Sequence, residues 1–225
     1  MIDKQFPSVA EAVADIPDGA TVMIGGFGAS GSPIELIHAL IDHGAGDLTV
    51  INNNTGNGEV GLAALIGHGQ VRKMICSFPR SSQSRVFPKL YKAGRIELEL
   101  VPQGTLAERI RAAGAGIPAF FTPTTVGTVL AEGKEIREFD GRPYVMEPWL
   151  KADFALVKCE VADHVGEGVG RVGFDQLPRL VLAQHGELRL AARVTEPGER
   201  TGHLSPYRSA ASWYFWRAAD TELMT

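Results

Sequence analysis

Short apolar runs and longer amphipathic segments alternate along the first two-thirds of the chain. The run "TVMIGG" (21–26) is rich in β-branched residues and ends at glycines, as expected of a strand buried on both faces. The segment "SPIELIHALIDHGA" (32–45) follows it with helical spacing of its apolar residues. We expect Ser32 to be the N-cap of this helix, Pro33 its first residue and Gly44 its end.

The same alternation continues further along the chain. Strands are predicted at "DLTVINNN" (47–54), "VRKMICSF" (71–78) and "RIELELVP" (95–102), and helices at "VGLAALIGHG" (60–69), "SRVFPKLYKAG" (84–94) and "TLAERIRAAGAG" (105–116). The second of these helices should break near Pro88, and the third should begin with a capping box of Thr105 and Glu108. This order predicts an α/β fold with an open, mainly parallel sheet flanked by helices.

Composition narrows the class of protein and its partners. The 225 residues suit one large domain or two small ones. A net charge of -4 provides no basic field, so neither nucleic acid nor a membrane is an expected partner. The two cysteines, Cys76 and Cys159, form no disulfide framework and fit buried thiols in a reducing cytoplasm. We find no leader-like N-terminus and no apolar run of the roughly 20 residues that span a bilayer, and we expect a cytoplasmic protein.

The glycine loop "GGFGASG" (25–31) lies between the first predicted strand and its helix. Such a loop offers free backbone N–H groups and the positive end of a helix dipole to a ligand. Glycines also occur in strand-to-helix turns that bind nothing, and the loop is neither a P-loop nor a clean dinucleotide motif. Phe27 within it would pack against an apolar ligand arm or fill the core below. The residues alone leave both alternatives open.

The stretch "DGATVMIGGFGASGSP" (18–33) resembles the signature of the family I coenzyme A transferases. That signature has an Asp-Gly or Asn-Gly start, three apolar residues, Gly-Gly-Phe and a later Gly-x-Pro, and each position is matched. The resemblance continues through "NNNTGNGEVGLAAL" (52–65), "VRKMICSFPR" (71–80) and "LAEGKE" (130–135), and it covers roughly residues 1–158. It is a resemblance to the A (α) subunit, which in this family pairs with a separate B subunit.

The resemblance implies a function. "CSFPR" and the segment after it are more similar to the bacterial 3-oxoadipate transferases than to the succinyl-CoA:acetoacetate enzymes. It therefore implies transfer of CoA from succinyl-CoA to a 3-oxoacid, with 3-oxoadipate as the first candidate. Acetoacetate or another 3-oxoacid is an alternative, as is a catalytically inactive chain that only binds its partner. A phosphosugar isomerase or sensor of similar architecture is a further alternative, in which the loop would hold phosphate.

The resemblance also implies a set of site residues. CoA esters would be substrates, with no permanently bound cofactor and no metal, and the nucleophilic glutamate would belong to the B subunit. Gln103 would be the donor to the oxyanion, which the resemblance favours over the alternative that Pro102-Gln103-Gly104 is only a turn. The residues expected to bind CoA are those of the glycine loop: Gly25, Gly26, Phe27, Gly28, Ala29, Ser30 and Gly31.

Two weaker candidates concern the acid substrate. Asn52 and Asn53, with Asn54, form a polar cluster at a predicted strand end and could hydrogen-bond the substrate, although Asn is also a common turn residue. Arg80 could pair with the distal carboxylate of a dicarboxylic oxoacid through its guanidinium fork. The spacing of the histidines predicts neither a zinc site nor a catalytic triad.

The pattern changes near residue 160. All seven lysines lie at or before Lys158, whereas the basic residues beyond it are all arginine, and the periodicity fades. We therefore divide the chain into a transferase core (1–160) and an atypical tail (161–225), and hypothesise that the tail is frameshifted or poorly ordered.

Overall fold

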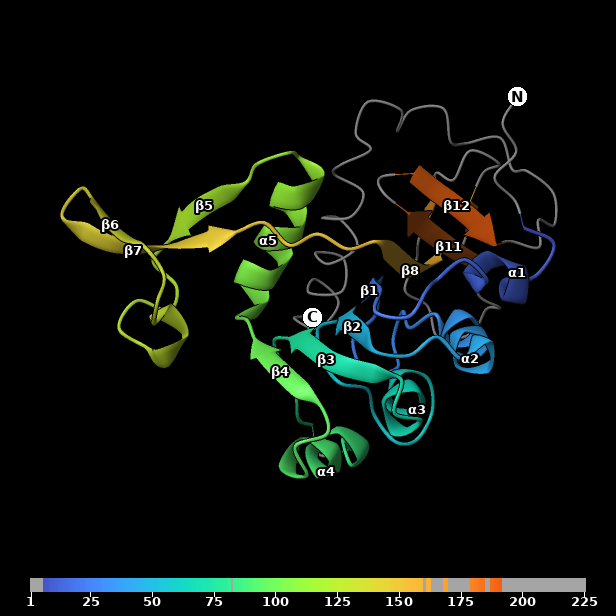
Figure 1. Cartoon of the computed structure of the whole chain (residues 1–225). Helices are drawn as coiled ribbons and strands as arrows, with labels where there is room; N and C mark the ends of the chain where they lie inside the picture. The colour runs from blue at the N-terminus through green and yellow to red at the C-terminus, as the bar shows by residue number, and fades with distance from the viewer. Residues whose placement is uncertain are drawn as a thin grey trace, which may run out of the picture.

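The computed structural model describes residues 6–81, 83–159, 161–162, 168–169, 179–184 and 187–191. Their main element is a seven-stranded sheet of order β12-β11-β8-β1-β2-β3-β4 (Figure 1). Its strands are β1 (Thr21–Ile24), β2 (Leu48–Ile51), β3 (Val71–Cys76), β4 (Glu97–Leu100), β8 (Phe154–Cys159), β11 (Arg179–Gln184) and β12 (Glu187–Ala191). Strands β8 and β1 to β4 are parallel, whereas β11 and β12 are antiparallel to their neighbours. The predicted open, mainly parallel α/β sheet is confirmed.

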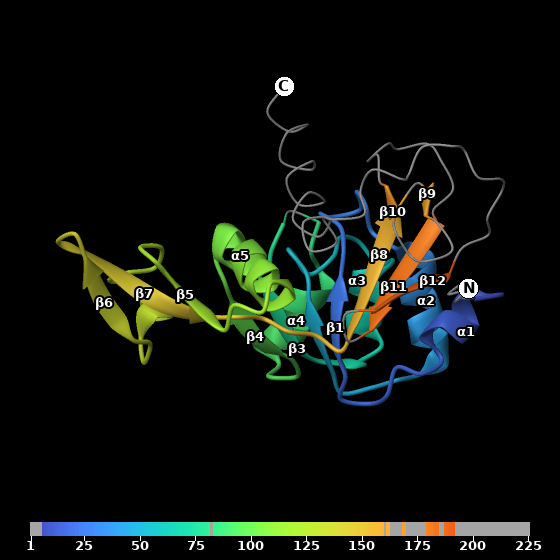
Figure 2. The same ribbon diagram turned by 90° about the horizontal axis from the view of Figure 1, so that it is seen from above.

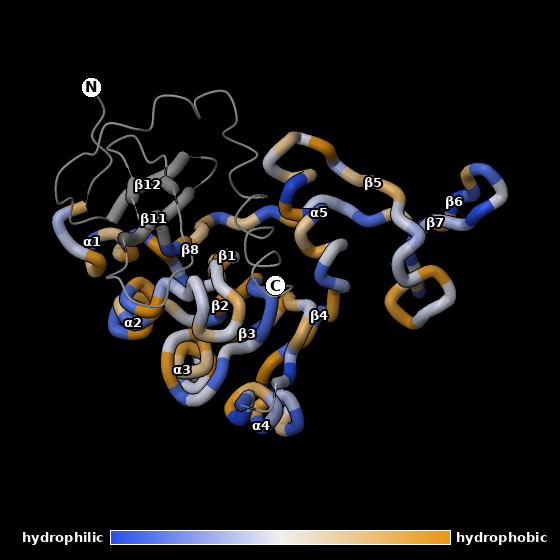
Figure 3. The backbone as a smooth tube through the Cα atoms, turned by 180° about the vertical axis from the view of Figure 1, so that it is seen from behind, coloured by the Kyte–Doolittle hydropathy of each residue, from blue (hydrophilic) through white to orange (hydrophobic). Residues whose placement is uncertain are grey.

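Helices cover both faces of this sheet. The first four pack in sequence against one face: α1 (Val9–Val13), α2 (Ile34–His43), α3 (Leu62–Gly67) and α4 (Val86–Lys92). The longer helix α5 (Gln103–Gly114) packs against the other face. Successive side chains of a strand point to opposite faces of the sheet. Val22 and Ile24 therefore belong to the first core cluster, between the sheet and α1 to α4, whereas Met23 packs against the second core cluster, between the sheet and α5. In Figure 3 hydrophilic and hydrophobic segments alternate along α2, as expected of a helix with one buried face.

A second, three-stranded antiparallel sheet stands to one side of the main body (Figures 1 and 2). It consists of β5 (Ala119–Thr122), β6 (Ile136–Phe139) and β7 (Arg142–Pro148), with the short 3-10 helix η1 (Val129–Ala131) between β5 and β6. A further pair of short strands, β9 (Val161–Ala162) and β10 (Gly168–Val169), forms its own ladder. The sequence pattern predicted no element between residues 117 and 151.

Two predicted helix starts are wrong. Helix α2 has Pro33 as its N-cap residue without a side-chain cap, and Ser32 is buried beside it. Helix α5 begins at Gln103, so Thr105 lies inside the helix and is buried. Glu108 makes no capping box, because its carboxylate accepts hydrogen bonds from Arg111 at 2.6 and 2.8 Å.

The predicted break at Pro88 is also wrong, whereas the predicted end of α2 is confirmed. Pro88 is the third residue of an uninterrupted α4 and so lies in the first turn, where a backbone N–H has no helical partner to lose. Gly44 ends α2 in the left-handed conformation, with φ of 86°.

The region after residue 160 is described only in part. Within it, β11 pairs with β8 and β12 pairs with β11, so both continue the main sheet. Apart from β9 and β10, which pair with each other, the other residues of the predicted tail lie outside the described residues, and the boundary at residue 160 stays a prediction. Over the described part of the chain, the structure has no helix with the length and apolarity needed to cross a membrane.

Candidate functional site

The carboxyl ends of β1, β2, β3 and β4 lie side by side along one edge of the main sheet. Neighbouring strands are about 4.8 Å apart, so these four ends span roughly 14 Å. The glycine loop follows β1, the Asn52–Asn54 cluster follows β2, Arg80 follows β3 and Gln103 follows β4. All the site residues predicted from the sequence therefore lie along this carboxyl edge, where open α/β sheets bind their ligands.

The glycine loop is held by contacts with its own main chain. Phe27 N–H donates to the Ser30 carbonyl at 2.8 Å, and Ser30 N–H donates back at 3.1 Å. Gly26 has φ of 109°, and a Cβ at this position would lie 2.8 Å from the backbone nitrogen of Ser32. Close backbone approach within the loop itself therefore requires glycine at position 26.

The outer side of the loop is open. Phe27 is 40% exposed and so does not fill the core, contrary to one of the two alternatives for this residue. Gly28 faces the side-chain amide of Asn57, which would lie 2.9 Å from an added Cβ. A small hollow between the loop and the segment after β2 is lined by Gly28, Ala29, Gly56 and Asn57, among others. A larger hollow around 14–18 and 43–45 lies at the opposite edge of the sheet, away from the predicted site.

Asn52 is occupied by structural hydrogen bonds. Its Nδ2 donates to the Ile24 carbonyl at 2.6 Å and, at 3.4 Å, to that of Gly25. Its Oδ1 accepts from Asn54 N–H at 2.8 Å, which is a side-chain turn of the kind that Asn favours. Asn52 thus links the end of β2 to the start of the glycine loop.

Asn53 differs from Asn52 because one polar atom of its side chain, Nδ2, has no hydrogen-bond partner among the described residues. The residue is 1% exposed, and its Oδ1 accepts from the hydroxyl of Ser77. Its backbone carbonyl accepts from the N–H groups of Ser77 and Phe78. Its Nδ2 has no hydrogen-bond partner among the described residues. Since an unpaired buried donor is costly, an acceptor brought to this edge would gain by pairing with it.

Arg80 and Gln103 are both exposed. Within the described ranges neither side chain has a hydrogen bond or ion pair inside the chain, so both are free to meet a ligand. Gln103 is the first residue of the twelve-residue helix α5, next to the free N–H groups of its first turn. The unpaired guanidinium of Arg80 follows β3 on the same edge.

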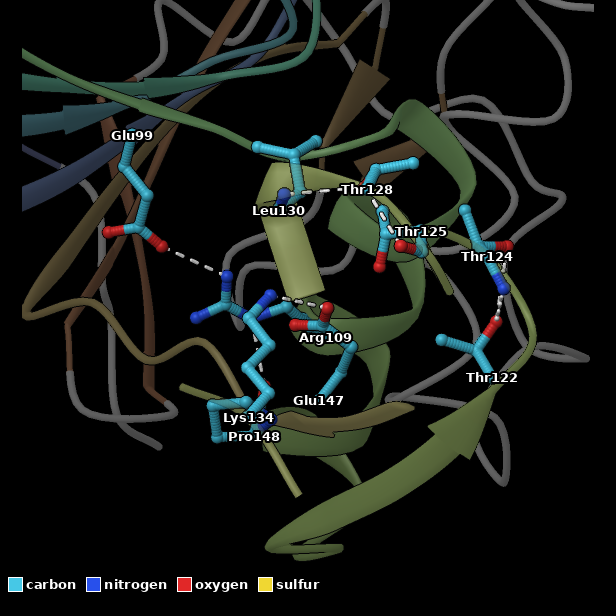
Figure 4. A network of polar contacts seen from close by, with 10 residues as sticks. All are labelled: Glu99, Arg109, Thr122, Thr124, Thr125, Thr128, Leu130, Lys134, Glu147 and Pro148. Atoms are coloured by element: carbon cyan, nitrogen blue, oxygen red, sulfur yellow. Dashed lines mark hydrogen bonds and ion pairs between the residues drawn. The ribbon is translucent and has the colours of Figure 1, made fainter. Parts of the chain in front are cut away.

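Sequence reasoning missed a charged cluster beneath this edge. Glu99 pairs with Lys73 at 2.6 Å. It also pairs with Arg109 at 3.0 Å, and Arg109 donates through Nε to the Pro148 carbonyl at 2.8 Å (Figure 4). Burial opposes ionisation of Glu99, but the hydrogen bonds and charges of Lys73 and Arg109 outweigh it and hold its pKa below the ordinary value. One signal in the sequence could have indicated this cluster: Arg109 lies three residues after the apolar Leu106, and residues with this spacing share one face of a helix.

A fully buried carboxylate was missed as well. Glu147 is 1% exposed, and its Oε1 pairs with Lys134 Nζ at 2.6 Å (Figure 4). Its other oxygen, Oε2, has no partner among the described residues. The pair joins β7 to the segment after η1, within the small sheet and away from the carboxyl edge. No pattern in the sequence marked it.

Several large apolar side chains are exposed at or beside the carboxyl edge. Phe78 is 52% exposed after β3, and Leu100 is 40% exposed at the end of β4. Phe27 is exposed after β1, and Val60, which is 59% exposed, lies in the segment between β2 and α3 and lines the small hollow beside the glycine loop. Clustered exposed apolar side chains mark sites that a ligand or another protein covers.

The chain is thus an α/β protein with a glycine-rich loop at the carboxyl edge of its sheet, which is where proteins of this class usually bind their ligands. The sequence profile described as Coenzyme A transferase matches residues 6–195. The chain is 56% identical to the A subunit of 3-oxoadipate CoA-transferase from Pseudomonas putida over 200 residues, covering 88% of this chain and 87% of that protein. It is 48% identical to the A subunit of a probable succinyl-CoA:3-ketoacid coenzyme A transferase from Bacillus subtilis, covering 87% and 82%. The chain belongs to the coenzyme A transferase family.

Solved structures show the same architecture. The acyl-CoA transferase YdiF from Escherichia coli O157:H7 superposes with a TM-score of 0.66 at 24% identity, covering 75% of this chain and 36% of that one. A variant of the decarboxylase AibA/AibB gives 0.63 at 25% identity, covering 99% and 100%. Since a transferase and a decarboxylase share this fold, the architecture does not by itself determine the reaction.

Proposed function

We propose that this chain is the A subunit of a two-component CoA-transferase that moves CoA from succinyl-CoA to a 3-oxoacid, with 3-oxoadipate as the first candidate. The observation that carries the proposal is the carboxyl edge, where an open glycine loop and the unpaired amide of Gln103 follow strands of one sheet. The 56% identity to a chain named as part of a 3-oxoadipate CoA-transferase supports the choice of substrates. CoA esters are then substrates, not resident cofactors, and the reaction takes place in the cytoplasm.

The reaction requires a carboxylate nucleophile that attacks the thioester and later carries CoA itself as an enzyme thioester. We place this glutamate on the B subunit. Glu99 of the present chain is unsuited to attack, because its two oxygens are held by Lys73 and Arg109. The exposed apolar side chains of the carboxyl edge, Phe27 and Phe78 among them, are the surface that we expect bound CoA and the B subunit to cover.

Each attack on a carbonyl produces an oxyanion, and we assign its stabilisation to Gln103. A preorganised donor at such a position contributes roughly 3 to 4 kcal/mol to the transition state. The exposed amide at the start of α5 adds to the free N–H groups of that helix terminus. The main chain of 25–31 would hold the CoA ester, with the exposed ring of Phe27 against its pantetheine arm.

Two residues, Arg80 and Asn53, would bind the acid substrate. The unpaired guanidinium of Arg80 suits the distal carboxylate of a dicarboxylic acid, which 3-oxoadipate has and acetoacetate lacks. The unpaired Nδ2 of Asn53 is a donor for a substrate oxygen. Asn52 has no polar atom left for substrate in this structure, and we retain it as part of the loop's support.

The decisive experiment co-expresses the chain with a candidate B subunit, then measures succinyl-CoA-dependent activation of 3-oxoadipate. We expect turnover from the pair, none from either chain alone, and a fall of about 100- to 1,000-fold in kcat for Gln103→Ala. Turnover by the chain alone would contradict the proposal, as would a Gln103→Ala pair with full activity.

The choice of acid is tested separately. Arg80→Ala should raise KM for 3-oxoadipate at least about tenfold, the effect of losing roughly 1.4 kcal/mol of binding, while sparing acetoacetate. Arg85→Ala is the matched control, since Arg85 is an exposed arginine at the start of α4. An equal loss with both acids would remove Arg80 from substrate recognition.

A further inference from the structure

Arg109 joins three parts of the molecule that are distant in the sequence. Its guanidinium reaches Glu99 on β4 at 3.0 Å and the Pro148 carbonyl at the end of β7 at 2.8 Å. Its own carbonyl accepts from Leu150 N–H at 2.9 Å. Arg109 is only 7% exposed, although it carries a permanent charge. An arginine is rarely buried so completely unless its charge is paired, as it is here by Glu99.

The Glu99 contact closes the turn on which Gln103 lies. The chain leaves β4 after Leu100, turns at Pro102 and enters α5 at Gln103. Glu99 stands just before this turn, and Arg109 stands six residues into the helix, which is about 9 Å along its axis. The ion pair therefore holds the end of β4 to helix α5, on either side of the turn after which Gln103 lies.

Directional contacts are needed here because the apolar packing of α5 is not directional. Leu106 packs against Ile75 and its neighbours in the second core cluster, and Ile110 packs beside them. Hydrophobic contact restrains the distance of a helix from a sheet but is tolerant of sliding along the helix axis. Charge-assisted hydrogen bonds to fixed points on β4 and β7 resist that sliding.

We propose that Arg109 is a positioning residue that sets the place of Gln103 at the carboxyl edge by fixing α5 on β4. The proposal rests on the function proposed above for Gln103. A misplacement of about 1 Å at a reacting centre can cost on the order of 100-fold in rate. Arg109 acts through the helix and touches no substrate.

The kinetic test compares Arg109→Gln with Arg111→Gln in the complex with the B subunit. Arg111 lies on the same helix, but its partner Glu108 is one turn away within α5, so its loss does not free the helix from the sheet. We expect Arg109→Gln to lower kcat by about 10- to 100-fold with KM for succinyl-CoA changed less than about twofold. Arg111→Gln should leave both within about twofold. Equal effects of the two variants would overturn the proposal.

A double variant separates positioning from a general loss of structure. Once Gln103 is alanine the placement of its amide no longer matters, so Arg109→Gln should lower kcat much less in the Gln103→Ala background than in the unaltered chain. Multiplied effects of the two substitutions would show that Arg109 acts independently of Gln103, and would overturn the proposal. If Gln103→Ala alone retained full activity, the role proposed for Gln103 would fail and that of Arg109 with it.

A measurement on the isolated chain does not depend on turnover. We expect Arg109→Gln to increase amide hydrogen exchange of 101–110 at least about tenfold, while Arg111→Gln leaves this segment as in the unaltered chain. Unchanged exchange in Arg109→Gln would overturn the proposal even if the chain proved to have another activity. Increased exchange in a chain that has no CoA-transferase activity would contradict the proposed function and leave the restraint of α5 by Arg109 supported.

Discussion

Gly26 combines a backbone conformation and a contact that together disfavour every other residue. Its φ of 109° is strained for any side chain, and an added Cβ would meet the backbone of Ser32 at 2.8 to 2.9 Å. Backbone cannot move aside as the end of a flexible side chain can. The glycine at position 26 is therefore required by the folded conformation of the loop itself, whether or not the loop binds a ligand.

Gly26→Ala should therefore lower the free energy of unfolding by about 2 to 4 kcal/mol, from strain and steric overlap together. Gly19→Ala is the matched control, because Gly19 also has a positive φ, of 77°, but no atom lies within 4 Å of its added Cβ. It should lose only about 1 kcal/mol. Urea unfolding of the two variants measures the difference, and equal losses would show that the contact with Ser32 does not matter.

Cys76 should be chemically inert in the folded chain. Burial raises the pKa of its thiol to about 12, outweighing a hydrogen bond from the Phe78 backbone that lowers it. Since the thiolate is the reactive form, a Cys159→Ser chain should not react with a thiol reagent at pH 8 until it is unfolded in denaturant. Labelling of the native chain at the rate of a small-molecule thiol would contradict this prediction.

At the scale of elements, strands β1 to β4 and helices α2 to α5 were predictable, because the strands are short apolar runs that end at turn residues and the helices have apolar residues at helical spacing. Helix α1 and strands β8, β11 and β12 of the same sheet were not predicted. The helix starts were less predictable, since Thr105 and Glu108 match a capping box in spacing while packing and the Arg111 contact decide their positions. The small sheet was missed because β5 and β6 do not alternate between buried and exposed residues, and in β7 the two buried positions are one apolar residue, Val145, and one charged residue, Glu147. All four residues of β6 are exposed, and those of β5 are uniformly half-buried.

The site divides in the same way. Gln103 and the glycine loop could be found because a motif and a predicted strand end coincide there. Arg109 could not be found, because its partners, Glu99 and the Pro148 carbonyl, are brought to it only by the tertiary fold. Glu97 and Glu99 occupy equivalent alternating positions in the sequence of β4, yet only Glu99 lies beneath α5.

The pairing of β3, β4 and α5 through Glu99 predicts an acid-sensitive restraint. The pKa of Glu99 is held below its ordinary value of 4.5, so its contribution to stability is present above that pH and is lost as the pH falls through the lower, folded value. Glu99→Gln should lower Tm at pH 7, and its difference from the unaltered chain should shrink below pH 4.5. Thermal unfolding between pH 7 and 3 measures this difference.

Glu97→Gln is the control for this series. The side chain of Glu97 is 64% exposed, and its contact with Arg72 is a long one of 3.6 Å. Its removal should hardly change Tm at any pH, because exposed ion pairs contribute little. The same pH dependence for both variants would show that Arg109 and Lys73 do not stabilise the charged form of Glu99.

At the scale of the whole molecule, the tail hypothesis can be tested at the level of the gene. The family match extends to residue 195, and β11 and β12 continue the main sheet, so residues 196–225 lie beyond both. If the tail is frameshifted, resequencing should recover residues of the family in another reading frame. An intact gene that encodes this tail beside a B-subunit gene would contradict the hypothesis.

The placement of β1 has a consequence for synthesis of the chain. Val22 pairs with Val50 on one side and with Phe154 on the other, so one edge of β1 stays open until most of the chain has left the ribosome. Protein synthesis adds about 5 to 20 residues per second, so the time between synthesis of β2 and synthesis of β8 is on the order of 10 s. During that time the nascent protein exposes unpaired main chain beside a finished ladder of four strands, which is a template for intermolecular association. Chaperone dependence should therefore be greatest for translation intermediates that end between β4 and β8.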